Sequence, residues 1–255
     1  MSAIRMTPIT GPKAWRGDRL TNDPSWIVTF TDADIAEMER ALTAAKSTGR
    51  AMAEIGREQF PLPTLAPKLV RVLDEIRNGR GFVVVRGLPV PRYSDDDVGL
   101  ILWGLGRYLG TPLHQNPQGD LLGHVYDHGR TYGNIDVRGY ETNAYLPYHT
   151  DAGDMVGLLC LRRGLEGGLS SIVSSVTVHN EILAQHPEFL GRGLNIDLGF
   201  VFRLLSHLQI VQGDCAFVVE NLCAFQLSLG QLLVGHRLPV VGKGAGNVGT
   251  LHLEQ

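Results

Sequence analysis

The sequence predicts an α+β protein, with helices first and then a β-sandwich or barrel. Three observations lead to this fold class. Apolar residues recur at helical spacing in three stretches between residues 31 and 108. Runs rich in β-branched and other apolar residues follow, and glycine-rich loops join them. The chain has 255 residues, which suits one large domain or two small ones and is enough for a substantial core.

Four helices are expected. The first begins at Thr31, a capping residue followed by acids in the first turn. The second covers roughly 64–78, and the third covers about 95–108 after an acidic start. The fourth covers 177–186 and stops before Pro187, because proline cannot continue a helix.

Strands are expected where apolar runs are bounded by turn residues. The predicted strands are 82–90, 155–162 and 170–176. Residues 1–30 are expected to be an irregular lead-in, 111–141 a loop, and 140–151 extended.

The composition changes after about residue 191. Residues 191–255 hold eight charged residues, whereas the first 190 residues hold 41. Leucine, valine and glycine dominate this tail, and turn signals are scarce until its end. We therefore divide the chain into a domain at 1–190 and an atypical tail at 191–255, which either completes the sheet or lies outside the standard fold.

Composition excludes several classes of partner. Charged residues make up 19% of the chain, the net charge is −3, and no Lys/Arg cluster is present, so nucleic acid is not expected as a partner. No run of 18 apolar residues exists, so no membrane span is expected. The N-terminus lacks an apolar core of signal-peptide length, and the three cysteines form no CxxC motif. These features favour a cytoplasmic protein, and they are compatible with a homo-oligomer.

The stretch LPYHTDAGD, residues 146–154, carries the candidate metal ligands His149 and Asp151. Residues i and i+2 of a strand point the same way, so this pair can chelate one ion. One imidazole and one carboxylate supply two of the three ligands of a non-haem Fe(II) site. Taken alone, such a pair in a polar loop–strand junction is more often structural than metal-binding.

Two other histidine–acid pairs have less suitable positions. His179 and Glu181 fall on a predicted helix, where residues two apart diverge. His186 and Glu188 flank Pro187 at a helix end.

Four blocks, in this order, resemble the TauD/TfdA-like family of Fe(II)- and 2-oxoglutarate-dependent dioxygenases. They are GFVVVRGLPV, LWGLGRYLGTPLHQNPQGDLLGHVYDHG, VRGYETNAYLPYHTDAGDMVGLLCLRRG and GGLSSIVSSVTVHNEIL. The resemblance covers roughly residues 12–190. It implies a double-stranded β-helix (jelly-roll) core with flanking helices. It also implies Fe(II) as cofactor, and 2-oxoglutarate, O2 and a small organic molecule as substrates, with succinate and CO2 as co-products.

The resemblance also implies roles for individual residues. His149 and Asp151 fall where the family has its first two iron ligands. Ser170 takes the place of a threonine that helps to hold 2-oxoglutarate, although a strand-edge serine bonded to its own backbone is an equal alternative. Thr142 and Asn143 precede the metal pair and are candidates for substrate contact, with an ordinary loop as the alternative.

The tail departs from the family pattern. The family has a distal histidine ligand and, ten to fifteen residues later, an arginine that pairs with 2-oxoglutarate. Of His207, His236 and His252, we prefer His236, because GDCAFVVEN before it is similar to a family strand. The cations that follow, Arg237 and Lys243, are not at the family's offset. If the tail does not supply the closing strands, the jelly roll is incomplete at its C-terminus and exposes strand edges.

The sequence is compatible with three functions. The leading hypothesis is an oxygenase that hydroxylates or oxidises a small molecule. The alternative is a truncated or degenerate homologue without catalysis. A zinc hydrolase on a jelly roll is a third, for which no residue stands out as the general base.

Overall fold

The computed structural model describes residues 5–131, 137, 141–144, 148, 153–163, 170–190, 210–212, 217–221 and 248–254. The helices are α1 (Gly17–Leu20), α2 (Asp32–Ser47), α3 (Ala66–Arg77), α4 (Asp95–Leu109) and α5 (Ser175–Gln185). Short 3-10 helices are η1 (Pro24–Trp26), η2 (Met52–Glu54), η3 (Val90–Arg92) and η5 (Pro187–Phe189). The strands are β1 (Ile27–Thr29), β2 (Phe82–Arg86), β3 (Thr111–Pro112), β4 (Gly123–Val125), β5 (Met155–Cys160), β6 (Ser170–Ile172), β7 (Ile210–Gln212), β8 (Phe217–Asn221) and β9 (Val248–Glu254).

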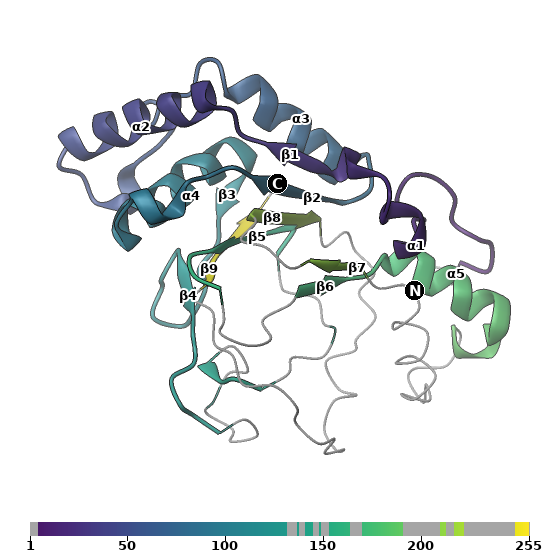
Figure 1. Ribbon diagram of the computed structural model, residues 1–255. Coiled ribbons are helices and arrows are strands. Elements are labelled where there is room, and N and C mark those ends of the chain that lie inside the picture. Colours follow the sequence, from purple (N-terminus) through teal and green to yellow (C-terminus); the bar gives the residue numbers. More distant parts are fainter. Residues whose placement is uncertain are drawn as a thin grey trace.

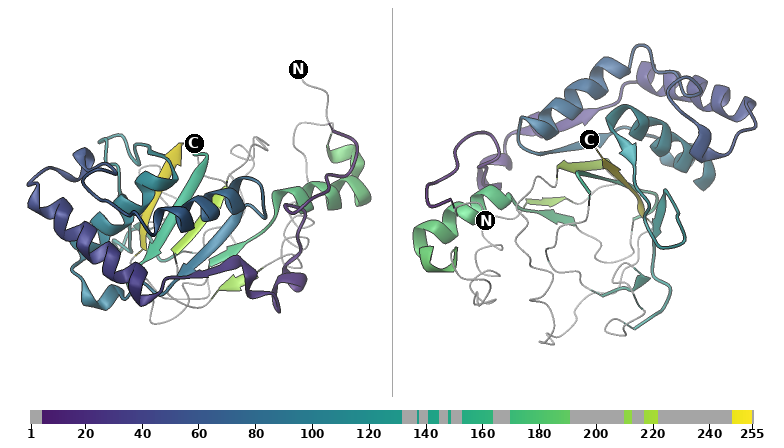
Figure 2. Two further views of the ribbon diagram at one scale, coloured as in Figure 1. Left: turned by 90° about the horizontal axis from the view of Figure 1, so that it is seen from above. Right: turned by 180° about the vertical axis from the view of Figure 1, so that it is seen from behind.

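Seven of these strands form one sheet, in the order β1-β2-β8-β5-β9-β3, with β4 also paired to β9 (Figure 1). The β1–β2 pair is parallel and the other pairs are antiparallel. Strands β6 and β7 form a separate two-stranded sheet. This smaller sheet lies on the side of the larger sheet that faces away from α2, α3 and α4 (Figures 1 and 2).

Helices α2, α3 and α4 cover one face of the large sheet (Figure 2). Alternate residues of β2 and β5 point toward them, because side chains along a strand alternate between its two faces. Val83 and Val85 of β2, with Met155 and Leu159 of β5, are buried in the same apolar cluster as the three helices. This cluster is the main core of the described part of the chain.

Helix α2 begins with the capping residue that the sequence predicts. Thr31 Oγ1 accepts a hydrogen bond from the Asp34 backbone N–H, and the Asp34 carboxylate accepts one from the Thr31 backbone N–H. The same carboxylate forms an ion pair with Lys68 of α3, which ties the two helices together. Burial alone raises the pKa of Asp34, but the hydrogen bonds from Lys68 and Thr31 outweigh it and hold the pKa below its ordinary value.

The Asp34 contacts predict a pH-dependent contribution to stability. A carboxyl whose pKa is lowered by folding stabilises the protein above its unfolded pKa, and this stability is lost as pH falls through the folded pKa. We expect Asp34→Asn to lower the free energy of unfolding by about 1 kcal/mol at neutral pH, and by less under acidic conditions. Urea unfolding at pH 7 and pH 3 measures this. Asp32→Asn, in the same first turn, is the matched control, and an Asp34→Asn effect that does not change with pH would contradict the assignment.

Helix α4 packs closely on a phenylalanine ring through Gly104. A Cβ atom at Gly104 would lie 2.5 Å from ring carbons of Phe60, which is fully buried. In contrast, a Cβ atom at Gly99 of the same helix would meet only the side-chain end of Leu122, at 3.2 Å. Gly104 therefore permits an approach that no other residue allows.

We expect Gly104→Ala to destabilise the protein by about 1–3 kcal/mol, because the overlap with Phe60 exceeds the gain in helix propensity. The matched variant Gly99→Ala gains the same propensity, worth up to about 1 kcal/mol, with a neighbour that can move. Thermal and urea unfolding of the two variants gives the comparison. If both variants change the free energy of unfolding equally, close packing against Phe60 does not restrict which residue can occupy position 104.

The N-terminal segment covers the other face of β2. Phe82 and Val84 are buried there against Trp15, Leu20 and Trp26. Both indole N–H groups donate hydrogen bonds. The N–H of Trp15 donates to the Arg80 carbonyl at 2.9 Å, and the N–H of Trp26 donates to the Leu20 carbonyl at 3.2 Å.

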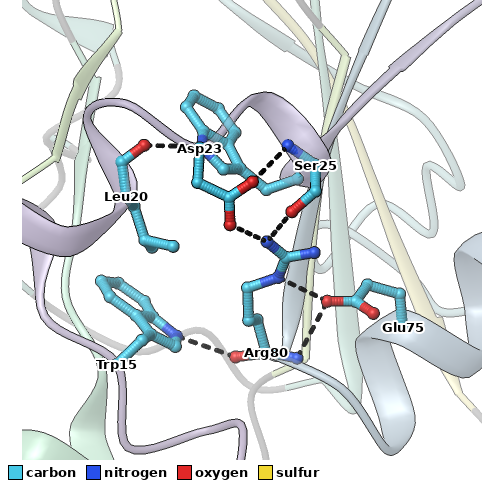
Figure 3. A network of polar contacts seen from close by, with 7 residues as sticks. Trp15, Leu20, Asp23, Ser25, Glu75 and Arg80 are labelled. Atoms are coloured by element: carbon cyan, nitrogen blue, oxygen red, sulfur yellow. Dashed lines mark hydrogen bonds and ion pairs between the residues drawn. The ribbon is translucent and has the colours of Figure 1, made fainter.

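Arg80 connects this segment to the end of α3 (Figure 3). Its guanidinium lies 2.6 Å from the Glu75 carboxylate and 2.8 Å from the Ser25 hydroxyl. The Asp23 carboxylate is also within 3.5 Å. The lead-in expected to be irregular thus contains α1, η1 and β1 and is held by specific contacts.

The four predicted helices are confirmed within a few residues, but the predicted strand at 170–176 is too long. Strand β6 ends at Ile172, and α5 begins at Ser175, because the Ser174 hydroxyl caps it by accepting from the Thr177 backbone N–H at 3.0 Å. The mixed helix and strand class is confirmed, and the jelly-roll core stays a prediction.

The atypical tail supplies strands to the large sheet. Strand β8 lies between β2 and β5, and β9 lies between β5 and β3. The described parts of residues 191–255 therefore join strands from the first 190 residues, and the division at residue 190 stays a prediction. Within the described residues, none of the helices is both long and apolar enough to cross a membrane.

Candidate metal centre

The predicted ligands His149 and Asp151 lie outside the described residues, as does His236. Their place in the chain is nevertheless close to a well-defined element. Strand β5 begins at Met155, four residues after Asp151. It is a central strand, with β8 on one side and β9 on the other. The pair therefore precedes a strand that is paired on both sides.

The start of β5 is paired with two segments of the tail. Met155 lies opposite Asn221 of β8 and Leu253 of β9. Val156 lies opposite His252 of β9. The sheet thus places the backbone of His252 beside the end of β5 that is nearest to His149 and Asp151 along the chain.

The sequence alone favours His236 over His252 as the third ligand. The signal that could have found it is the alternation of apolar and other residues in VGTLHLE, residues 248–254, which is typical of a strand. This pattern coincides with β9. The local sequence pattern does not indicate that β9 pairs with β5, because the two strands are far apart in sequence.

The candidate substrate residues Thr142 and Asn143 lie in a loop before the metal pair. Thr142 is half-buried, and its hydroxyl accepts a hydrogen bond from the Ala144 backbone N–H at 3.2 Å. Asn143 is exposed. The loop is held near residues 128–130, since the Glu141 carbonyl accepts from the His128 N–H at 2.9 Å and its carboxylate lies 3.2 Å from Arg130. A role in substrate contact stays a prediction for both residues.

The candidate 2-oxoglutarate residue Ser170 is the first residue of β6. It is exposed and lies opposite Gln212 of β7, in the two-stranded sheet. The glycine pair before it, Gly167 and Gly168, lies outside the described residues. Its role in holding 2-oxoglutarate also stays a prediction.

The pair His179 and Glu181 is confirmed to diverge on a helix. His179 of α5 is buried, at 2% exposure, whereas Glu181 forms an ion pair with Arg16. Burial of the imidazole, together with the nearby charge of Arg5, lowers the pKa of His179. The two side chains therefore have different surroundings and do not form a metal site with each other.

Within the described part of the chain, no three His, Cys, Asp or Glu side chains cluster in a way that could hold a metal ion. The HxD pair, which lies outside that part, stays the predicted metal site. Its donor set, an imidazole nitrogen and a carboxylate oxygen, suits Fe(II) when a second imidazole completes it.

Comparisons with known proteins cover the segment that contains this pair. The model of the family described as "Taurine catabolism dioxygenase TauD, TfdA family" matches residues 43–198. The chain is 28% identical over 192 residues to FR-33289 synthase of Streptomyces rubellomurinus, covering 75% of this chain and 57% of that protein. It is 32% identical over 184 residues to the taurine hydroxylase-like protein SAT17 of Stachybotrys chartarum, covering 69% of this chain and 48% of that protein. The chain thus spans about half the length of these relatives.

Solved structures of similar fold include an asparagine oxygenase in complex with Fe(II), 2S,3S-3-hydroxyasparagine and succinate. The TM-score is 0.55 at 15% identity, over 89% of this chain and 93% of that one. The non-heme iron oxygenase OrfP in complex with Fe gives a TM-score of 0.50 at 10% identity, over 89% and 93% of the two chains. At such low identities these structures support the fold alone. The family model covers more than half of the chain and includes both His149 and Asp151, and the chain therefore belongs to the TauD/TfdA family, whose enzymes use Fe(II) and 2-oxoglutarate.

Proposed function

We propose that this protein is an Fe(II)- and 2-oxoglutarate-dependent oxygenase that hydroxylates or oxidises a small organic molecule and releases succinate and CO2. The observation that carries the proposal is the family match over residues 43–198, which includes the HxD pair directly before the central strand β5. When bound, Fe(II) and 2-oxoglutarate would supply the activation of O2 that such an oxidation needs.

His149 and Asp151 are the proposed protein ligands of the iron. A neutral imidazole and a carboxylate, two residues apart on an extended chain, can bind one ion from the same side. Placement just before a strand that is paired on both sides favours a fixed orientation of the ligands, which a metal site requires.

We propose His252 as the third ligand, in place of His236. Its support is the register of β9, in which residue 252 lies opposite Val156, five positions after Asp151. His236 has no such support from a described neighbour. If His252 binds the iron, His252→Ala should abolish iron-dependent 2-oxoglutarate binding while His236→Ala retains it, and the reverse result would assign His236.

Ser170, Thr142 and Asn143 complete the proposed site. The Ser170 hydroxyl is exposed at the start of β6 and can donate a hydrogen bond to a carboxylate of 2-oxoglutarate. Thr142 and Asn143 precede the metal pair, where a small substrate would approach. The alanine variants Ser170→Ala and Asn143→Ala are expected to raise the KM for 2-oxoglutarate and for the substrate, respectively.

Formation of succinate tests the proposal. The full chain is incubated with Fe(II), 2-oxoglutarate and O2, and succinate is measured over time against reactions that lack Fe(II) or contain Zn(II) instead. We expect succinate only where Fe(II), 2-oxoglutarate and O2 are all present. Even without the true substrate, slow uncoupled turnover would produce it.

A non-catalytic homologue is the competing function, and the end of the family match at residue 198 favours it. Folded chain that binds neither Fe(II) nor 2-oxoglutarate would support this alternative. Hydrolysis that needs Zn(II) but no oxygen would instead support the zinc hydrolase.

A further inference from the structure

A cleft outside the proposed iron site lies where the C-terminal ends of α3 and α4 meet. Its volume is about 540 Å³, within the range of small-molecule sites. Three arginines line it, namely Arg57, Arg77 and Arg107. The other described residues that line it are Leu73, Tyr108, Leu109, Gly110 and Thr111, so none of the described lining residues is acidic.

The three guanidinium groups have no acidic partner within the described side chains. The ion pairs of that part of the chain involve other arginines, such as Arg16, Arg80 and Arg162. Arg57 and Arg77 are exposed and Arg107 is half-buried. This local excess of positive charge contrasts with the net charge of −3 of the whole chain.

Two of the arginines are held in place by neutral groups. Arg57 Nε donates a hydrogen bond to the Arg107 carbonyl at 2.7 Å, and its guanidinium lies 5.2 Å from the centre of the Tyr108 ring. The Arg107 guanidinium lies 5.9 Å from the centre of the Trp103 ring. These contacts fix the side chains and leave guanidinium N–H donors free of any carboxylate partner.

The charge balance favours an anion. Arg77 ends α3 and Arg107 lies in the last turn of α4, where each helix end carries roughly −0.5 elementary charge. Two helix ends thus offset about one of the three positive charges. A net positive charge remains among the described residues that line the cleft.

We propose that the cleft between α3 and α4 binds a small molecule that carries a phosphate group, through Arg57, Arg77 and Arg107. Guanidinium groups present paired N–H donors that match phosphate oxygens, and several arginines together suit a multiply charged anion better than a single carboxylate. This site goes beyond the proposed oxygenase chemistry and does not depend on it.

Isothermal titration of the full chain with inorganic pyrophosphate at low ionic strength tests the proposal. We expect saturable binding that weakens as salt is added. Arg77→Gln and Arg107→Gln should each weaken it by about 10-fold, and the double variant should remove it. Arg107→Gln keeps the backbone carbonyl that anchors Arg57. A melting curve of each variant verifies that it is folded.

Arg71→Gln is the matched control, because Arg71 is exposed on the same helix α3 and does not line the cleft. It should leave binding unchanged. A nucleoside diphosphate is titrated alongside pyrophosphate. Tighter binding of the nucleotide would identify it as the type of ligand, and equal binding would show that the phosphates alone are recognised. The proposal is wrong if the wild-type chain does not bind pyrophosphate, or if Arg71→Gln weakens binding as much as Arg77→Gln.

Discussion

Replacing His149 by alanine is expected to reduce the formation of succinate from 2-oxoglutarate by more than about 100-fold, because loss of a direct ligand costs more than loss of an outer-shell partner. Asp151→Ala should have an effect of similar size. Both variants should also lose iron, which can be measured by metal analysis after desalting. The free energy of unfolding of both variants without metal should change little, because the substitutions affect metal binding.

His186→Ala is the matched control for this experiment. His186 is half-buried and belongs to another histidine–acid pair, with Nδ1 3.1 Å from the Glu188 carboxylate. It should leave succinate formation and iron content unchanged. Retention of iron and activity in His149→Ala would contradict the assignment of the HxD pair.

Trp103→Ala is expected to have the largest effect on stability, about 3–5 kcal/mol. Trp103 of α4 is buried, at 1% exposure, in the core between the helices and the sheet. Its indole N–H donates to the Ile55 carbonyl at 2.8 Å. Alanine would leave a large cavity and remove the donor of a buried carbonyl.

Trp103→Phe separates these two causes. Phenylalanine keeps most of the apolar volume but cannot donate the hydrogen bond, so we expect a loss of about 1–3 kcal/mol. Urea unfolding of the metal-free chain measures both variants. Equal losses in Trp103→Ala and Trp103→Phe would mean that the hydrogen bond, and not packing, accounts for the contribution of this residue.

Local sequence patterns predicted the helices well, because their signals lie within a few residues. Thr31 caps α2 as expected, and Pro187 follows the end of α5. The strand predicted at 170–176 is too long because Ser174 caps a helix. This cap outweighs the strand preference of the β-branched residues after it. Local sequence does not indicate β1 in the lead-in, because this strand is only three residues long and forms through pairing with β2.

The tail could not be predicted because its strands are defined by distant partners. Strand β8 pairs with both β2 and β5, and the paired residues are 58 (Leu159 and Phe217) to 138 (Phe82 and Glu220) positions apart in the chain. Strand β9 shows an alternating pattern, yet nothing local indicates that it lies beside β5. The same limit applies to the candidate site. The HxD motif predicts two ligands from local sequence, whereas the proposed third ligand lies in a distant part of the chain that only the fold can bring near.

The anaerobic complex of the purified chain with Fe(II) and 2-oxoglutarate tests the central claim most directly. Chelation of iron by the keto acid gives a visible charge-transfer absorption that needs neither oxygen nor the unknown substrate. We predict that this band appears in the wild-type chain, saturates with 2-oxoglutarate and is absent from His149→Ala. Folded wild-type protein without the band would contradict the account, and the family would then describe the ancestry of the chain and not its activity.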